Sequence, residues 1–132
     1  MDYEAVLFAN EAFYRAFASR DLEAMQALWA SHRPVACVHP GWGVLTDRDA
    51  IIESWRGILA SANAPEISCR EARAFLIGDV AFVICFEAID GGFLIATNIF
   101  AREDGRWKIV HHQAGPTAEQ PEDGGEPEAV VH

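Results

Sequence analysis

Histidine and tryptophan residues gather in two short segments that lie about 70 positions apart in the chain. The first segment contains His39 and Trp42 around a Pro-Gly turn, and the second runs from Trp107 to His112. Imidazole and indole rings each join an apolar body to a hydrogen-bonding edge. If the fold brings the two segments together, they suit a small, mostly apolar molecule that carries a polar group.

One carboxylate interrupts an otherwise apolar run. Glu87 follows the seven apolar residues of segment 80–86. A buried carboxylate needs a hydrogen-bonding or cationic partner, and its pKa can shift toward that of a general base or acid. Together with His39 and His111, Glu87 is therefore a candidate catalytic residue. The alternative is structural: Glu87 leaves the strand end and pairs with a surface arginine, while each imidazole caps a turn or fills a gap in the core.

The first 65 residues carry helical patterns around one short strand. Apolar residues at helical spacing predict a helix over 3–18 and a second short helix after Asp21. Residues 35–39 are typical of a strand that a Pro-Gly turn ends. A third helix, with Thr46 as its N-cap residue, carries Trp55 on its apolar side.

From residue 66 onward the pattern is that of strands. Turn residues separate four runs, which predicts an antiparallel meander of strands over 67–77, 80–89, 93–102 and 107–113. Helices first and sheet afterwards indicate an α+β domain, with the helices packed on one face of a curved sheet that leaves a conical cavity. Residues 1–116 form this domain, and the Glu-, Pro- and Gly-rich segment 117–132 is expected to be a disordered acidic tail.

Strand alternation decides which side chains share the cavity. In the last strand Lys108 needs water, so Trp107 should face the helices; alternation then directs His111 into the cavity and His112 to the outer face. In the strand before it, both faces are largely apolar. Because helices cover only one face, we expect a second subunit to cover the other.

Further side chains are candidates for binding a ligand. Trp42, in a glycine-flanked loop, is interpreted as a lid; its alternative is a plug at the sheet edge. Asn98, in an apolar strand, could orient a histidine or a ligand carbonyl. The candidate ligand-binding residues are Trp42, Trp55, Asn98, Tyr14 and Phe100. For Trp55, which lies on a helical apolar stripe, a place in the core is the competing interpretation.

The order of elements and the closing segment Gly-Arg-Trp-Lys-Ile-Val-His-His (105–112) resemble the NTF2-like or SnoaL-like superfamily, which has a cone-shaped, cystatin-like fold. The His-Pro-Gly-Trp turn and the Ser54-Trp55 pair resemble its small stand-alone members. The resemblance covers residues 3–116 and implies dimerisation through the sheet. It does not choose between isomerases, cyclases, dehydratases and binding modules. Its acid–base members use a cavity aspartate; the aspartates here fit caps or turns, so a histidine or Glu87 would have to move the proton.

Composition narrows the functional classes. A net charge of −10 argues against nucleic acid as a partner, and no apolar run approaches the roughly 20 residues that span a membrane. The three cysteines lie in apolar runs, which favours reduced thiols in a cytoplasmic protein. No metal or cofactor is expected.

The sequence thus predicts a homodimer, paired through the outer sheet face, that binds a small apolar or amphipathic molecule. It is either a cofactor-independent acid–base enzyme (isomerase, cyclase or dehydratase type) acting on an apolar carbonyl-containing substrate, or a non-catalytic ligand-binding or assembly module.

Overall fold

The computed structural model describes residues 2–122 of the chain. Three helices and five strands make up these residues: α1 (Asp2–Ala18), α2 (Leu22–Leu28), β1 (Ala36–Val38), α3 (Arg48–Ala60), β2 (Ser68–Ile77), β3 (Val80–Ile89), β4 (Gly92–Glu103) and β5 (Arg106–Pro116). The strands form one sheet in the order β1-β5-β4-β3-β2. Strands β2 to β5 are the expected antiparallel meander, and β1 adds to it in parallel beside β5.

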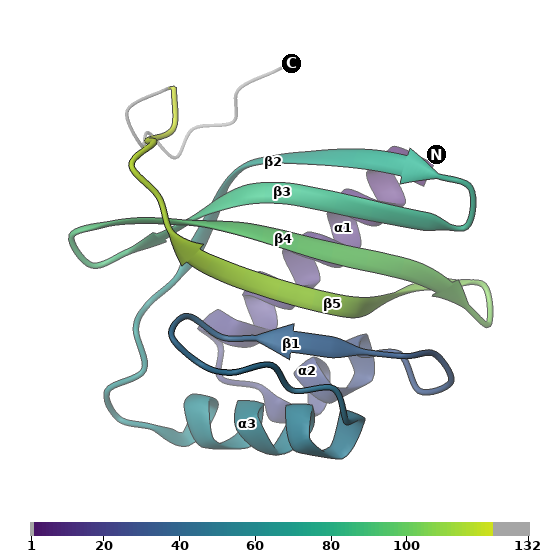
Figure 1. Ribbon diagram of the computed structural model, residues 1–132, viewed down its shortest axis with the longest axis horizontal. Helices are drawn as coiled ribbons and strands as arrows, with labels where there is room; N and C mark the ends of the chain where they lie inside the picture. Colours follow the sequence, from purple (N-terminus) through teal and green to yellow (C-terminus); the bar gives the residue numbers. More distant parts are fainter. Residues whose placement is uncertain (1, 123–132) are drawn as a thin grey trace.

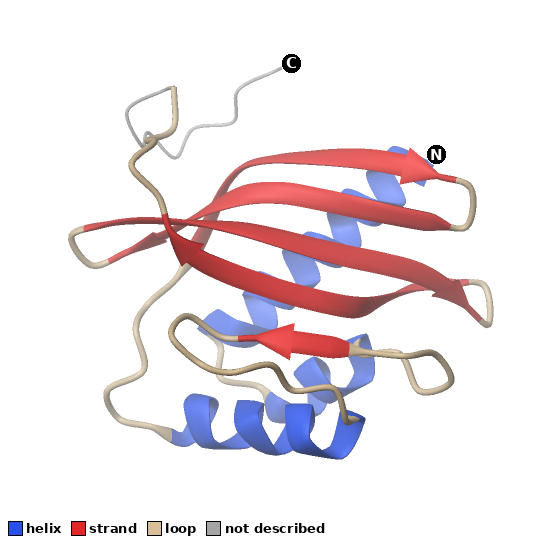
Figure 2. Ribbon diagram, in the orientation of Figure 1, coloured by secondary structure: helices blue, strands red, loops and turns tan. Residues whose placement is uncertain are grey.

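Helices and strands form separate layers, which confirms the α+β class. Helix α1 crosses one face of the sheet, and α2 and α3 lie beyond the edge formed by β1 (Figure 1). The opposite face of β2 to β5 carries no helix (Figure 2). Within residues 2–122, no helix is long and apolar enough to cross a membrane.

Aspartate side chains begin two of the helices. The carboxylate of Asp21 accepts a hydrogen bond from Ala24 N at the start of α2, and that of Asp47 accepts one from Ala50 N at the start of α3. The expectation that Thr46 caps α3 is therefore wrong by one residue. The carboxylate of Asp47 satisfies a backbone N–H group of the first turn that has no partner within the helix.

The register of β5 changes within the strand. Phe100 of β4 pairs with Ile109, whereas the adjacent Ile99 pairs with His111, so Val110 is an extra residue on β5. Such a bulge reverses the alternation of all side chains that follow it. His112 is consequently on the face that meets the helices, and His111 is on the outer face beside Ile99.

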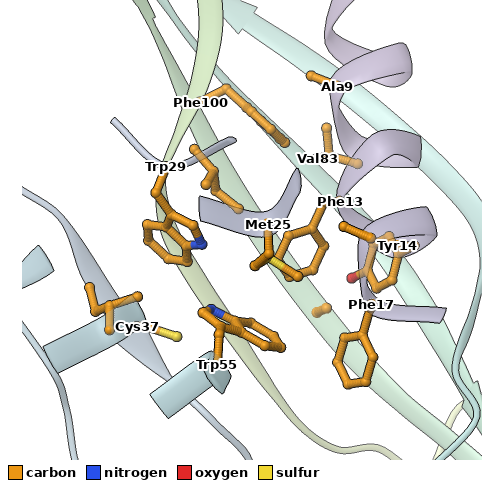
Figure 3. Close-up of a cluster of buried hydrophobic side chains, with 14 of the residues drawn as sticks. Ala9, Phe13, Tyr14, Phe17, Met25, Trp29, Cys37, Trp55, Val83 and Phe100 are labelled. Atoms are coloured by element: carbon orange, nitrogen blue, oxygen red, sulfur yellow. The ribbon is translucent and has the colours of Figure 1, made fainter. Parts of the chain in front are cut away.

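Aromatic side chains fill the space between the helices and the sheet. Phe13 and Phe17 of α1 both pack edge-to-face on Trp55 of α3, with ring centroids 5.5 and 5.2 Å apart. Trp29 and Trp55 are almost completely buried and lie in the same cluster (Figure 3). Burial of one large apolar side chain stabilises a fold by roughly 1.5–3 kcal/mol. This packing closes much of the conical space that the element order predicts.

The outer face of the sheet is apolar and only half-buried. On β3 the outward residues include Phe82, Ile84 and Phe86, and on β4 they include Ile95 and Ile99. The Phe75 and Phe82 rings of neighbouring strands stack with their centroids 4.8 Å apart. The surplus of apolar strand positions expected from the sequence thus lies on one continuous surface.

Part of the expected acidic tail lies within the described residues. Residues 117–122 follow β5, and Pro121 among them is buried. The expected disorder of segment 117–132 stays a prediction. The rest of the expected tail, 123–132, lies outside the described residues.

Candidate functional site

Glu87 is a buried carboxyl group that hydrogen-bonds to the first helix. Its side chain lies on the inner face of β3 and is 2% exposed. The Tyr14 hydroxyl of α1 donates to Glu87 Oε2 over 2.7 Å. Burial raises the pKa of Glu87, and the bond from Tyr14 offsets this only in part. The structural alternative, a pair between Glu87 and a surface arginine, is wrong: this carboxyl resembles a general acid in its surroundings.

Asn98 connects the hydrogen bonds on the inner face. Its Nδ2 donates to Asn10 Oδ1 over 2.8 Å and to the Tyr14 hydroxyl over 3.2 Å. Its Oδ1 is left as an acceptor and lies 2.6 Å from Nδ1 of His112. His112 therefore donates through Nδ1, and the neutral ring carries its lone pair on Nε2. We call Asn10, Tyr14, Glu87, Asn98 and His112 the polar relay.

His112, and not His111, is the inner histidine of β5. The expectation that His111 faces the cavity is wrong, because the bulge at Val110 exchanges the two positions. His112 is 2% exposed and packs against Phe13 with ring centroids 5.0 Å apart. Burial lowers the pKa of His112 to about 3, so its imidazole is neutral at pH 7. No signal in the sequence marks this bulge. The prediction from strict strand alternation therefore placed His111 on the inner face instead of His112.

An acid and a base thus lie close together in the relay. His112 Nε2 is 4.0 Å from Glu87 Oε2, too far for a direct hydrogen bond. One oxygen atom could contact both groups from a position about 2.8 Å from each. The arrangement can give a proton to one atom of a bound molecule and remove a proton from a neighbouring one.

His39 lies where the sequence led us to expect it, at the end of β1 and beside the same aromatic cluster. Its ring is 4.8 Å from the Trp42 and Trp55 rings and 6.3 Å from the His112 ring, centroid to centroid. Ser54 donates its hydroxyl proton to Ile51 O, so Ser54 Oγ accepts from His39 Nε2 over 2.9 Å. Burial lowers the pKa of His39 to about 4. The ring is therefore neutral at pH 7.

The five candidate ligand-binding residues do not all lie together. Tyr14 and Asn98 belong to the polar relay, and Trp55 lies beside both His39 and His112, with its ring centroid 4.8 and 5.9 Å from theirs. Trp42 is 49% exposed and covers His39 from the solvent side. Phe100 is 1% exposed and lies away from Trp55 in the core (Figure 3).

A hollow of about 510 Å³ opens at the C-terminal end of α1, and its lining contains no residue of the polar relay. It lies between the end of α1, the segment before β2 and the turn after β3, and its lining includes Phe17, Ser68 and Ala88. Phe17 also packs on Trp55, and Ala88 directly follows Glu87. Phe17 is therefore a wall that the hollow shares with the aromatic cluster. A second hollow, of about 800 Å³, lies at the other end of α1, beside Trp107.

The described part of the chain offers no cluster of three or more histidine, cysteine, aspartate or glutamate side chains that could hold a metal ion. His39 and Glu87 do not form such a group with His111, because His111 lies on the outer face.

The architecture and the closing strand pair are those of a known family, and a family model described as a SnoaL-like domain matches residues 6–119. The chain belongs to the SnoaL-like domain family. This confirms the superfamily resemblance of the sequence. The match spans every helix and strand except the first four residues of α1.

Two solved structures share 32% identity with this SnoaL-like domain. One is a candidate dehydratase of the NTF2-like family from Streptomyces avermitilis, with a TM-score of 0.82 over 89% of this chain and 97% of that one. The other is a candidate calcium/calmodulin-dependent protein kinase type II association domain from Thiobacillus denitrificans, with a TM-score of 0.74 over 83% and 92%. A cystatin-like protein from Nostoc punctiforme, 15% identical with a TM-score of 0.72 over 89% and 92%, shares the fold.

A curated relative carries the domain within a longer chain. F-box protein SKIP8 of Arabidopsis thaliana is 28% identical over 112 residues, which cover 83% of this chain and 48% of the relative. The chain thus spans about half the length of that relative.

Proposed function

We propose that this domain is a cofactor-independent acid–base enzyme of the dehydratase or isomerase type, acting on a small, mostly apolar carbonyl compound. One observation carries the proposal: the lone pair on His112 Nε2 lies 4.0 Å from a buried carboxyl group whose pKa is raised. General acid–base catalysis works best when both groups are positioned and hold the correct protonation state before the substrate arrives. The polar relay positions both groups, and burial shifts the pKa of Glu87 toward the protonated form that an acid needs.

The groups have distinct roles in a dehydration. His112 Nε2 removes the proton next to the substrate carbonyl, and Glu87 gives its proton to the departing hydroxyl group, which leaves as water. Because Glu87 Oε2 accepts from Tyr14, Oε1 is the oxygen that carries the proton in the protonated form of Glu87. After the reaction His112 holds a proton and Glu87 is a carboxylate. A water molecule in the bridging position, about 2.8 Å from each group, passes that proton from His112 to Glu87 and restores the starting state.

Substrate enters, in this proposal, through the hollow of about 510 Å³ beside Phe17. The hollow has the volume of a small-molecule site, and rotation of Phe17 opens it toward the relay. The 32% identity with a candidate dehydratase supports the same class of reaction. His39, Trp42 and Trp55 form the far wall, where a neutral imidazole and two indoles favour an uncharged ligand over a charged one.

The experiment follows small β-hydroxy ketones and enolisable cyclic ketones by NMR in D2O, recording water loss and exchange of the protons next to the carbonyl. We expect His112→Gln and Glu87→Gln to slow turnover by about 10²–10⁴-fold, the usual contribution of a positioned acid or base. His111→Gln is the matched control, one residue away and on the other face, and should leave the rate unchanged. Equal rates for the wild type, His112→Gln and Glu87→Gln would contradict the proposal.

We further propose that the domain forms a homodimer through the outer face of the sheet, which would also serve a purely non-catalytic assembly module. Two observations favour this: Phe82, Ile84 and Ile99 lie half-exposed on a face that no helix covers, and a 32% identical relative is a candidate association domain. Contiguous apolar surface of this kind marks protein interfaces. Light scattering coupled to size exclusion measures the assembly directly.

A further inference from the structure

Two cysteines lie on the same face of neighbouring strands at the edge of the polar relay. Cys69 of β2 pairs with Glu87 of β3, and Cys85 is two positions away on the same face of β3, so the two cysteines are diagonal neighbours. Both are reduced, as is Cys37 on β1. Diagonal neighbours on paired strands are about 7–8 Å apart, so a disulfide between them requires a small movement of the two strands toward each other.

Both thiols contact the relay. Tyr14 Oη lies 3.4 Å from Cys85 Sγ, and Asn10 Nδ2 donates to Cys69 Sγ over 3.6 Å. Since the Tyr14 hydroxyl already donates to Glu87 Oε2, it can accept the proton of the Cys85 thiol while passing its own to the carboxylate form of Glu87. A thiol becomes a nucleophile when it loses its proton. Cys85 thus has a proton acceptor within reach.

The two thiols differ in access. Cys85 is 1% exposed, whereas Cys69 is half-buried and follows Ser68, which lines the hollow of about 510 Å³. Because its side chain is the more exposed of the two, Cys69 is the thiol that a small oxidant from solvent reaches first. We propose that Cys69 and Cys85 are a redox pair, in which a peroxide oxidises Cys69 and Cys85 then closes a disulfide between β2 and β3.

The chemistry balances in two steps. The Cys69 sulfur attacks one oxygen of hydrogen peroxide, the O–O bond breaks, and Cys69 becomes a sulfenic acid while one water leaves. The Cys85 sulfur then attacks the Cys69 sulfur, the S–O bond breaks, and the proton from Cys85, passed through Tyr14 and Glu87, leaves with the hydroxide as a second water. Two thiols lose two electrons, and one peroxide is reduced to two waters.

The neighbouring thiol of Cys85, followed by burial, raises the pKa of Cys69. The thiolate is therefore scarce at pH 7, and the first step should be slower than the oxidation of a free thiol. The second step gains from proximity, because the resolving Cys85 lies on the same face as the oxidised Cys69 and diagonal to it. The pair should consequently pass to the disulfide without accumulating sulfenic acid, and the disulfide should displace Cys69 from Asn10.

The experiment uses the full, reduced chain with hydrogen peroxide at pH 7, followed by denaturation, alkylation and mass spectrometry. Before treatment three cysteines should be alkylated. After treatment we expect Cys37 alone to be alkylated, with peptide mapping showing a Cys69–Cys85 link within one chain. In a Cys85→Ser variant, or Cys85→Ala if that folds better, dimedone should trap sulfenic acid at Cys69 and no internal link should form.

A Tyr14→Phe variant tests the proton acceptor, with the expectation that the disulfide closes several-fold more slowly. A merely loosened fold would expose the thiols and speed the reaction, so the direction of the change separates the two causes. Retention of all three thiols under conditions that oxidise free cysteine completely would overturn the proposal. So would a disulfide that includes Cys37, or one that joins two chains.

Discussion

His112 Nε2 lies 4.0 Å from Glu87 Oε2 on the inner face of the sheet, although the two residues come from strands that are not neighbours. Asn98, on the strand between them, hydrogen-bonds to His112 Nδ1. Asn98 on β4 thus determines which nitrogen of His112 carries the proton. On its other side, Asn98 is connected to Glu87 through the Tyr14 hydroxyl. The geometry of this pair leads to the predictions that follow.

The hydrogen bond from Tyr14 to Glu87 should contribute measurably to stability. Tyr14→Phe removes the donor and leaves a buried carboxyl oxygen without its partner, which should lower the free energy of unfolding by about 1–3 kcal/mol. Urea denaturation measures the difference. Tyr3→Phe, on the same helix but with Tyr3 55% exposed, is the matched control and should change stability by less than about 0.5 kcal/mol. Equal effects of the two substitutions would count against the relay.

The tautomer of His112 should depend on Asn98. Asn98→Asp replaces the amide oxygen that accepts from Nδ1 with a carboxylate oxygen, and an adjacent negative charge favours the imidazolium form. We expect the pKa of His112 to rise from about 3, observed in the imidazole nitrogen shifts by NMR. The tautomer itself is visible in the same spectra of the wild type, which should show a protonated Nδ1. A protonated Nε2 at pH 7 would contradict the assigned direction of the relay.

Acid should destabilise the fold in a defined window. The pKa values of His39 and His112 are lowered to about 4 and about 3, from 6.5 in an unfolded chain. Between these values the unfolded chain binds protons that the folded chain does not, so stability is greatest above pH 6.5 and falls as the pH decreases toward 4.

Glu87 acts in the opposite sense, because its raised pKa contributes stability that is lost as the pH rises through the folded value. Urea midpoints recorded from pH 8 to pH 4 measure both slopes. His39→Gln should flatten the acid slope, and Glu87→Gln should remove the loss at higher pH. A Glu87→Gln midpoint that stays constant between pH 6.5 and pH 4 would disprove the histidine assignment, because the opposing contribution of Glu87 is absent from that variant.

The assembly should depend on the outer sheet face. Ile84→Glu places a charge in the middle of this face, where a partner would have to bury it, so the variant should be monomeric. Phe8→Glu, on the exposed side of α1 with Phe8 64% exposed, should leave the dimer intact. Analytical ultracentrifugation at micromolar concentration distinguishes the two. A monomeric wild type would refute the dimer.

Most of the fold follows from the sequence, because its signals are local. The period of apolar residues separates α1 and α3 from the strands, and Gly-containing turns set the three hairpins of the meander. The position of His39 beside Trp42 also follows, since a Pro-Gly turn ends β1 directly after this histidine. The apolar run before Glu87 made a buried position one of two alternatives, and the sequence did not choose between them.

The tertiary structure alone decided which histidine joins Glu87. Alternation along β5 is a local rule, but the bulge at Val110 depends on how β5 pairs with β4, and one extra residue reverses every later side chain. The proximity of Cys69 and Cys85 arises in the same way, because residues 16 positions apart come close only through the pairing of β2 with β3. Residue types determined the chemistry available to this chain, and strand register determined which of those residues face one another.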